Sequence, residues 1–225
     1  MTVEKGRPWE RPASGPPECQ VDGDDAALAA TVRDRPGARI AFRPSAGSDL
    51  ARALSLDPSG LEPEGAHTLE LPVDALRVDV DGQPRLAVNM VVLGAAPDRL
   101  RRLDRAVAIT VVVDGRVLRD ERALTVVLAS GQYLRGLDLV PRGHPGDGRI
   151  EVQVYAPRPG ERRAMRDRVR RGEHLPHPRI IQVAGRRIEV RSADRALRLE
   201  IDGVPAPTAR QVVVEVIPEA FCLMA

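Results

Sequence analysis

The sequence contains very few aromatic residues and almost no lysine. Aromatic side chains make up 2% of its 225 residues, and Lys5 is the only lysine, so nearly all of the basic charge is arginine. Proteins that bind single-stranded nucleic acid stack the bases on clustered aromatic rings. The net charge of +2 is also too balanced for a protein that works mainly on a polyanion. We therefore expect no nucleic-acid partner.

Long apolar runs and paired cysteines are also lacking. The longest apolar runs are the length of strands and fall short of the roughly 20 residues that a membrane-spanning helix needs. Residues 1–18 contain no apolar stretch after their charges, which predicts that no secretory signal is present. Cys19 and Cys222 lie far apart, without the spacing of metal ligands. These features predict a cytoplasmic protein that is not transmembrane.

The 20 prolines and 19 glycines indicate many turns and few long helices. Residues 1–20 are rich in proline, glycine and charge, and we expect a disordered tail there. Residues 21–66 contain a predicted helix at 25–33, a strand at 39–42 and a second helix at 49–56. This segment is therefore expected to be a rudimentary α/β fragment.

From residue 67 onward the hydrophobic period changes to 2, which is typical of strands with one face in solvent. Leu197, Leu199 and Ile201, for example, alternate with charged residues. Such strands are far more often antiparallel than parallel, and Asp-Gly pairs supply turns between them. The predicted fold class is therefore α+β and mostly β, with an antiparallel β-sandwich over residues 67–225. Strands are expected at 75–80, 86–93, 107–113, 124–129, 150–156, 187–191, 197–202 and 212–217, with one helix at 161–171.

Several short motifs follow one another in a specific order. Residues 171–178 read Arg-Gly-Glu-His-Leu-Pro-His-Pro, and a basic strand at 185–190 and the turn Asp202-Gly-Val follow them. Ser130-Gly-Gln-Tyr and the turn containing Asp147 precede them. This order resembles the C-terminal domain of the bacterial diacylglycerol and sphingosine-type lipid kinases.

The resemblance extends more faintly to the first half. Residues 43–54 are similar to the family's Gly-Thr-x-Asn-Asp loop and the helix that follows it. Residues 22–26, Asp-Gly-Asp-Asp-Ala, stand where the family has a glycine-rich phosphate loop. The resemblance implies catalytic positions, here vestigial or reused, at Asp24, Asp49 and Asp202. It also implies a cleft between the two parts, lined by Ser45, Ser48, Asn89, Ser130 and Val204, and makes Asp147 a weak candidate for a metal ligand.

The departures from the family pattern bear on function. Residues 22–26 keep one glycine and add carboxylates, whereas phosphate loops depend on glycine and on backbone N–H groups. Val204 stands where the family has the carboxylate that resemblance implies is the base, and valine cannot accept a proton. The family also places about three β-α units ahead of the glycine loop, where this sequence has a proline-rich segment. We expect degraded ATP and catalytic motifs and no cofactor, with ATP and Mg²⁺ needed only by a kinase.

Three functions stay open on this basis. The first is a non-catalytic relative that binds a lipid, another hydrophobic small molecule or a protein partner. The second is an enzyme recruited to different chemistry in the same cleft, and the third is a divergent lipid kinase. The arginine-rich helix predicts a weak contact with anionic membrane surfaces, because Met165 and Val169 give it only a narrow apolar stripe. Homo-oligomerisation is left open.

Overall fold

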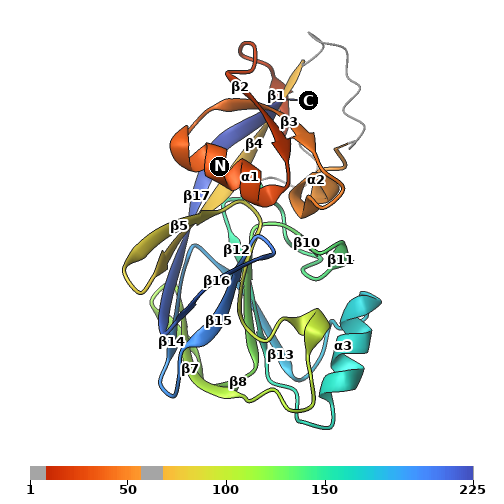
Figure 1. Cartoon of the computed structure of the whole chain (residues 1–225), viewed down its shortest axis with the longest axis vertical. Coiled ribbons are helices and arrows are strands. Elements are labelled where there is room, and N and C mark those ends of the chain that lie inside the picture. The colour runs from red at the N-terminus through yellow and green to blue at the C-terminus, as the bar shows by residue number, and fades with distance from the viewer. Residues whose placement is uncertain (1–8, 57–67, 225) are drawn as a thin grey trace.

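The computed structural model describes residues 9–56 and 68–224 and has a small α/β part at one end of a larger β-sandwich (Figure 1). The first sheet contains β1 (Arg11–Pro12), β2 (Cys19–Gly23), β3 (Arg39–Pro44), β4 (Leu69–Val80), β5 (Gln83–Ala87), β7 (Val107–Val113), β8 (Arg116–Ala123), β14 (Arg187–Ser192) and β17 (Gln211–Met224). The second sheet contains β6 (Met90–Gly94), β9 (Thr125–Ala129), β12 (Ile150–Tyr155), β13 (Ile180–Gly185), β15 (Leu197–Ile201) and β16 (Val204–Ala209). A hairpin of β10 (Tyr133–Leu134) and β11 (Leu137–Asp138) is separate, and the helices are α1 (Asp25–Asp34), α2 (Asp49–Ala53), α3 (Arg162–Arg170) and the 3₁₀ turn η1 (Pro97–Arg99).

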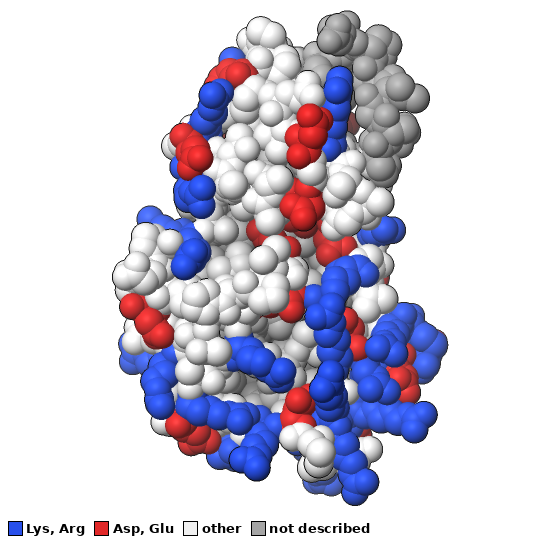
Figure 2. Space-filling view, in the orientation of Figure 1, with Lys and Arg blue, Asp and Glu red and all other residues white. Residues whose placement is uncertain are grey.

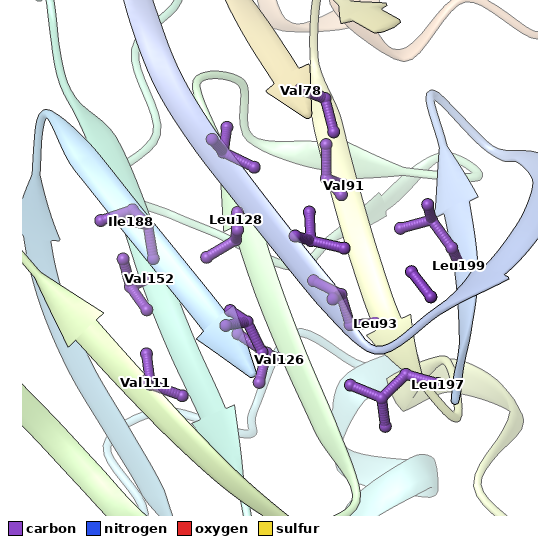
Figure 3. Close-up of a cluster of buried hydrophobic side chains, with 14 of the residues drawn as sticks. Val78, Val91, Leu93, Val111, Val126, Leu128, Val152, Ile188, Leu197 and Leu199 are labelled. Atoms are coloured by element: carbon purple, nitrogen blue, oxygen red, sulfur yellow. The ribbon is translucent and has the colours of Figure 1, made fainter. Parts of the chain in front are cut away.

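The core of the sandwich lies between the two sheets. Figure 3 shows Val78, Val111 and Ile188 of the first sheet together with Val91 and Leu128 of the second, and all five are fully buried. These residues are β-branched or leucine, which pack well on a pleated surface. The aromatic-poor composition is therefore sufficient for this core.

The second sheet is covered on its other face as well. Helix α3 packs there through Met165 and Val169, which contact a cluster that includes Met90 and Tyr155. Met165 and Val169 are four positions apart, which is about one helical turn, so both side chains lie on the same face. The narrow apolar stripe of this helix is consequently buried against the sandwich.

The α/β part is joined to the sandwich through the first sheet. Strands β2 and β3 are parallel, and β3 is also parallel to β17, with Arg39 opposite Cys222. Helix α1 packs Leu28 and Val32 into a core that also contains Ile40 and Phe221. Strands β4 and β17 run side by side from this part into the sandwich, so one sheet serves both (Figure 1).

The strand expected at residues 86–93 is two strands in different sheets. β5 pairs with β4 in the first sheet, whereas β6 pairs with β9 and β15 in the second. The chain crosses between the sheets at Val88 and Asn89, whose N–H groups bond to the carboxylate of Asp202. Asn89 is the one polar residue in 86–93, and a single polar residue does not by itself predict a break in a strand.

The disordered tail expected at residues 1–20 is also corrected where the structure describes it. Strand β1 pairs with β4, and β2 begins at Cys19. The buried carboxylate of Glu70 accepts hydrogen bonds from the N–H and hydroxyl groups of Ser14 and from Arg11. Burial of a charge is tolerated because these three donors satisfy it, and they fix residues 11–14 to β4.

The predicted fold class is confirmed, since the described chain is mostly β and its sandwich is antiparallel. The predicted boundary at residue 66 lies outside the described residues and stays a prediction. None of the helices among the described residues is long and apolar enough to cross a bilayer.

Candidate functional site

A buried carboxylate, Asp25, lies at the junction of β2 and α1. Asp24 is the N-cap of α1 and accepts a hydrogen bond from the N–H of Ala27, as capping aspartates do. Asp25 is the first helical residue and points inward, with 4% of its surface exposed. Its oxygens accept hydrogen bonds from the Ser48 hydroxyl at 2.6 Å and from the Leu50 N–H at 3.1 Å. Asp25 thereby ties the start of α1 to the start of α2.

Asn89 connects this carboxylate to the sandwich. Its side-chain amide is 1% exposed and donates to Asp25 at 3.2 Å and to the carbonyl of Tyr133 at 3.1 Å. Its Oδ1 atom has no hydrogen-bond partner, and a Cβ atom added at Gly131 would lie 2.1 Å from it. Position 131 therefore requires a glycine, because a side chain there would collide with the Asn89 amide. The hydroxyl of the neighbouring buried residue Ser130 bonds weakly to the carbonyls of Val88 and Asn89, at 3.4 and 3.3 Å.

Asp202 lies in the β15–β16 turn, where it and Gly203 both have positive φ values, of 48° and 77°. This pair of left-handed residues is typical of a two-residue hairpin. The Asp202 carboxylate accepts hydrogen bonds from the N–H groups of Val88, Asn89 and Met90 at 2.9–3.0 Å. It thus holds the connection between the two sheets in place.

Asp49, at the start of α2, fixes the β10–β11 hairpin. It is buried and accepts hydrogen bonds from the N–H groups of Arg135 and Gly136. The Arg135 guanidinium in turn bonds to Asp98 through two nitrogens and to Glu200. The hairpin is therefore attached both to the α/β part and to the sandwich.

Burial raises the pKa values of two carboxyls in this cluster. The pKa of Asp202 is raised to about 7 by desolvation, with a further contribution from the charge of Asp25, against the effect of its backbone hydrogen bonds. The pKa of Asp25 is raised to about 6, again mainly by desolvation and to a smaller extent by Asp49. Both groups therefore change protonation between weakly acidic and neutral pH.

The structure brings together five of the residues that the sequence singled out. Ser48, Asp49, Asn89 and Ser130 are each at most 7% exposed, and Asp202 is half-buried with its carboxylate on the backbone of residues 88–90. Their polar side-chain groups are occupied largely by Asp25 and by backbone groups. An open cleft lined by them stays a prediction.

Four other predicted residues lie outside this cluster. Asp24 is exposed at the N-terminus of α1, and Ser45 is exposed in the turn before α2. Val204 is 46% exposed at the start of β16. Asp147 accepts a hydrogen bond from the N–H of Arg149. Within the described residues no group of three or more His, Cys, Asp or Glu side chains could hold a metal ion.

A comparison with protein families identifies the sandwich. The profile described as "YegS C-terminal NAD kinase beta sandwich-like domain" matches residues 92–225, which is more than half of the chain. The chain belongs to this family. The resemblance to diacylglycerol-type lipid kinases that the sequence motifs predict is thereby confirmed.

Solved structures show that the fold relationship extends beyond this YegS C-terminal domain. A diacylglycerol kinase from Bacillus anthracis str. Sterne matches with a TM-score of 0.70 at 17% identity, covering 91% of this chain and 75% of that one. A yeast NADH kinase complexed with NADH matches with a TM-score of 0.50 at 14% identity, covering 92% of this chain and 60% of that one. No curated protein matches. At these identities the structures show a shared fold.

Asp25 and Arg135 of this YegS-type chain were not identified as site residues from the sequence. Two adjacent aspartates at a strand–helix junction signal a helix cap, but the sequence does not tell which one is buried. For Arg135 the only local signal in the sequence is the glycine that follows it, which is typical of a tight turn. The structure has such a turn there, with a left-handed φ of 51° at Arg135. Their partners are distant in the sequence, at Asn89 and Glu200.

Proposed function

We propose that this chain is a non-catalytic relative of the diacylglycerol-kinase-like proteins. It keeps the sandwich and binds a lipid, another hydrophobic small molecule or a protein partner without transferring phosphate from ATP. The observation that carries this proposal is the β2–α1 junction, where resemblance to the kinases implies a phosphate loop and where this chain has carboxylates that are engaged in its own structure.

A nucleotide phosphate fits this junction poorly. Anions bind at helix N-termini because free N–H groups and the helix dipole point at them. Here Asp24 already accepts the N–H of Ala27, and Asp25 adds a second carboxylate in the first turn. Gly23 is the one glycine left in residues 22–26. A phosphate would therefore meet negative charge and few free donors.

The position of the base supports the same proposal. Val204 follows the Asp202-Gly203 turn where the resembled family has a carboxylate, and its apolar side chain is exposed. The neighbouring carboxylate of Asp202 accepts three backbone N–H groups. Loss of a general base lowers the rate by about 10²–10⁴-fold. Both the nucleotide site and the base thus argue against phosphotransfer.

An assay of phosphate transfer from ATP to a diacylglycerol tests the proposal. We expect no turnover above background under conditions in which an active diacylglycerol kinase is fully active. Val204→Glu should not restore turnover, because the junction of residues 22–26 is unchanged in this variant. ATP-dependent turnover by the purified chain would refute the proposal and favour the divergent kinase, which would need ATP and Mg²⁺.

One observation favours a second candidate, an enzyme of different chemistry in the same place. A carboxyl with a pKa near neutrality suits general acid–base catalysis, and the pKa of Asp202 is raised to about 7. The carboxyl carbon of Asp202, followed by NMR through a pH titration, distinguishes the two. A pKa near 7 is required for the catalytic role, whereas a pKa near the ordinary value of about 3.9 would exclude it and leave the non-catalytic role.

A cytoplasmic location belongs to the same proposal. Cys19 and Cys222 are both free thiols, which suits a reducing compartment. The partner can also be a second copy of the chain. Light scattering of the purified protein measures its mass and so tests whether it forms a homo-oligomer.

A further inference from the structure

A pocket of about 360 Å³ lies at the end of β6, beside the loop that follows η1. Its volume is in the range of small-molecule sites. The pocket combines basic and apolar side chains with one carboxylate. The charged residues in its lining are Asp104, Arg105, Arg195 and Arg198.

This pocket is separate from the buried carboxylate cluster. Met90, whose N–H bonds to Asp202, is the first residue of β6, and Gly94 at the pocket is the last. A strand rises roughly 3.3 Å per residue, so about 13 Å of strand lies between them. A ligand in the pocket would not contact Asp25 or Asp202 directly.

The charged groups in the pocket leave an excess of positive charge. Arg105 is exposed, and its guanidinium makes no hydrogen bond or ion pair within the described part of the chain. The Arg195 guanidinium donates to the carbonyl of Arg105 and interacts electrostatically with the exposed carboxylate of Asp194. Arg198 is 3.5 Å from the carboxylate of Asp104. Asp104 also accepts the N–H of Arg101. The site therefore offers three guanidinium groups against one carboxylate that is already engaged.

The walls of the pocket are held in place before any ligand arrives. The buried guanidinium of Arg162 in α3 donates to the carbonyls of Arg102 and Asp104, which anchors one wall from behind. Arg195 ties the other wall to Arg105, and the N–H of Ala193 donates to the carbonyl of Ala108. A preorganised site loses less entropy on binding than a flexible one.

An apolar surface adjoins these charges. Leu103 is 88% exposed, the most exposed of the large apolar residues that the structure describes. Val107, Leu124 and Leu197 line the pocket itself and are nearly buried. Figure 2 shows that Lys and Arg side chains gather over the half of the molecule that contains the sandwich. Leu103 lines the same pocket as the three arginines, so an exposed apolar group lies beside their positive charge.

The geometry points to a binding site for the phosphate group of an anionic amphiphile. A phosphate monoester carries about −1.5 to −2 charges near pH 7. This charge is opposite in sign and similar in size to the net charge of three arginines and one aspartate in the lining. Guanidinium groups bind phosphate oxygens through paired N–H donors. In this assignment Arg105, Arg195 and Arg198 hold the phosphate, and Leu103 and the apolar wall contact the hydrocarbon chain. The site goes beyond the proposed function and does not depend on it.

Calorimetric titration of the whole chain tests the assignment. The ligands are dihexanoyl phosphatidic acid below its micelle concentration, inorganic phosphate and dihexanoyl phosphatidylcholine. The variants are Arg105→Gln, which removes the free guanidinium, and Leu103→Asn, which removes the exposed apolar group. Arg168→Gln is the matched control, because Arg168 is an exposed arginine of α3 outside the pocket. All three side chains are exposed, so the fold should be kept.

We expect one phosphatidic acid to bind per chain and to bind more tightly than either other ligand. Arg105→Gln should weaken it about tenfold or more, as expected for loss of a charged hydrogen bond, and Arg168→Gln should leave it unchanged. Leu103→Asn should weaken phosphatidic acid but not inorganic phosphate. Equal losses in the two arginine variants would overturn the site in favour of diffuse surface charge. Inorganic phosphate binding as tightly as the lipid, or no binding at all, would overturn the amphiphile.

Discussion

Asp25, the first residue of α1, joins three segments that are far apart in the sequence, because its oxygens accept hydrogen bonds from the start of α2 and from Asn89 in the β5–β6 connection. A buried carboxylate is stable only where such donors surround it. Loss of one partner leaves buried groups unsatisfied, which costs about 1–3 kcal/mol each. The residue therefore stabilises the attachment of the α/β part to the sandwich.

Asp25→Asn should destabilise the protein by an amount that depends on pH. The pKa of Asp25 in the folded chain, about 6, is above the value of about 3.9 in an unfolded chain. Its contribution to stability is therefore fully present below about pH 4 and is lost as the pH rises through about 6. Asparagine does not titrate, so the stability difference from wild type should shrink as the pH rises from 4 to 7. Urea unfolding across this range measures it.

Asp24→Asn is the control for this experiment, because it changes the exposed neighbour and leaves Asp25 in place. A stability difference for Asp25→Asn that stays constant from pH 4 to pH 7 would contradict the raised pKa. An equal change with pH in both variants would show that the effect comes from general charge.

Gly131→Ala should destabilise the fold by about 1–3 kcal/mol, the usual effect of overpacking a tight site. The new Cβ atom would lie 2.1 Å from Oδ1 of Asn89, so the Asn89 side chain or the backbone must move. Gly160→Ala is the matched control, since nothing lies within 4 Å of a Cβ atom there. Urea unfolding of both variants measures the difference, and equal stabilities would show that the Asn89 amide is not confined.

The sequence indicates much of the carboxylate cluster at the residue scale. Ser48, Asp49, Asn89 and Asp202 are predictable because motifs in a specific order place them. In the structure Ser48 and Asn89 both bond to Asp25, and Asp202 bonds to the N–H of Asn89. Asp49 instead holds the β10–β11 hairpin. The choice between Asp24 and Asp25 is not predictable, because both can cap a helix. The partners of Asp25 come from α2 and Asn89, and only the folded chain brings these to it.

Helix α3 has exposed arginines on one face and a buried face that attaches it to the sandwich. Met165 and Val169 pack on the second sheet, as the spacing of four residues predicts. Arg162 is buried with them and caps the carbonyls of the neighbouring loop, although its sequence environment looks like a solvated basic run. Membrane contact through the remaining arginines stays a prediction.

Arg162→Gln should lower the free energy of unfolding by about 1.5–3 kcal/mol, because its buried guanidinium supplies charged hydrogen bonds to the carbonyls of Arg102 and Asp104. Arg163→Gln should change it by less than about 0.5 kcal/mol, because this side chain is 87% exposed and its ion pair with Asp167 is long, at 3.9 Å. Chemical denaturation of the two variants provides the comparison. Equal effects would show that the loop is not anchored through Arg162.

The strands are predictable from the sequence where one face is exposed to solvent and the other is buried. β7 has the bounds expected for residues 107–113, and its side chains alternate between buried and partly buried. β16 was missed because its sequence contains Pro205 and Pro207, which are tolerated there at the edge of a sheet. The break between β5 and β6 was missed because it depends on Asp202, more than a hundred residues later.

At the scale of the whole molecule, the α/β part and the sandwich share β4 and β17. A shared sheet makes independent unfolding of the two parts unfavourable, so we expect one cooperative transition. Trp9 is the only tryptophan, and its ring packs edge-on to His144 at 5.1 Å, which makes its fluorescence a probe of the junction. Far-UV circular dichroism reports mainly on the sheets.

The urea transitions followed by Trp9 fluorescence and by circular dichroism should coincide in midpoint and slope. Coincidence of two probes is a standard test of two-state unfolding. A Trp9 transition at clearly lower urea would show that the junction opens before the sandwich unfolds, and that the shared strands do not couple the two parts.

The pairing of β17 also has a consequence for how quickly this protein folds. β17 lies between β4 and β14, so the first sheet is complete only when the end of the chain pairs with β4, more than a hundred residues earlier. Two-state proteins dominated by such non-local pairings fold slowly, on a scale of about milliseconds to seconds. During that time β4 and β14 lack a strand between them, and exposed strand edges favour aggregation. Slow refolding and a yield that falls with protein concentration are therefore expected.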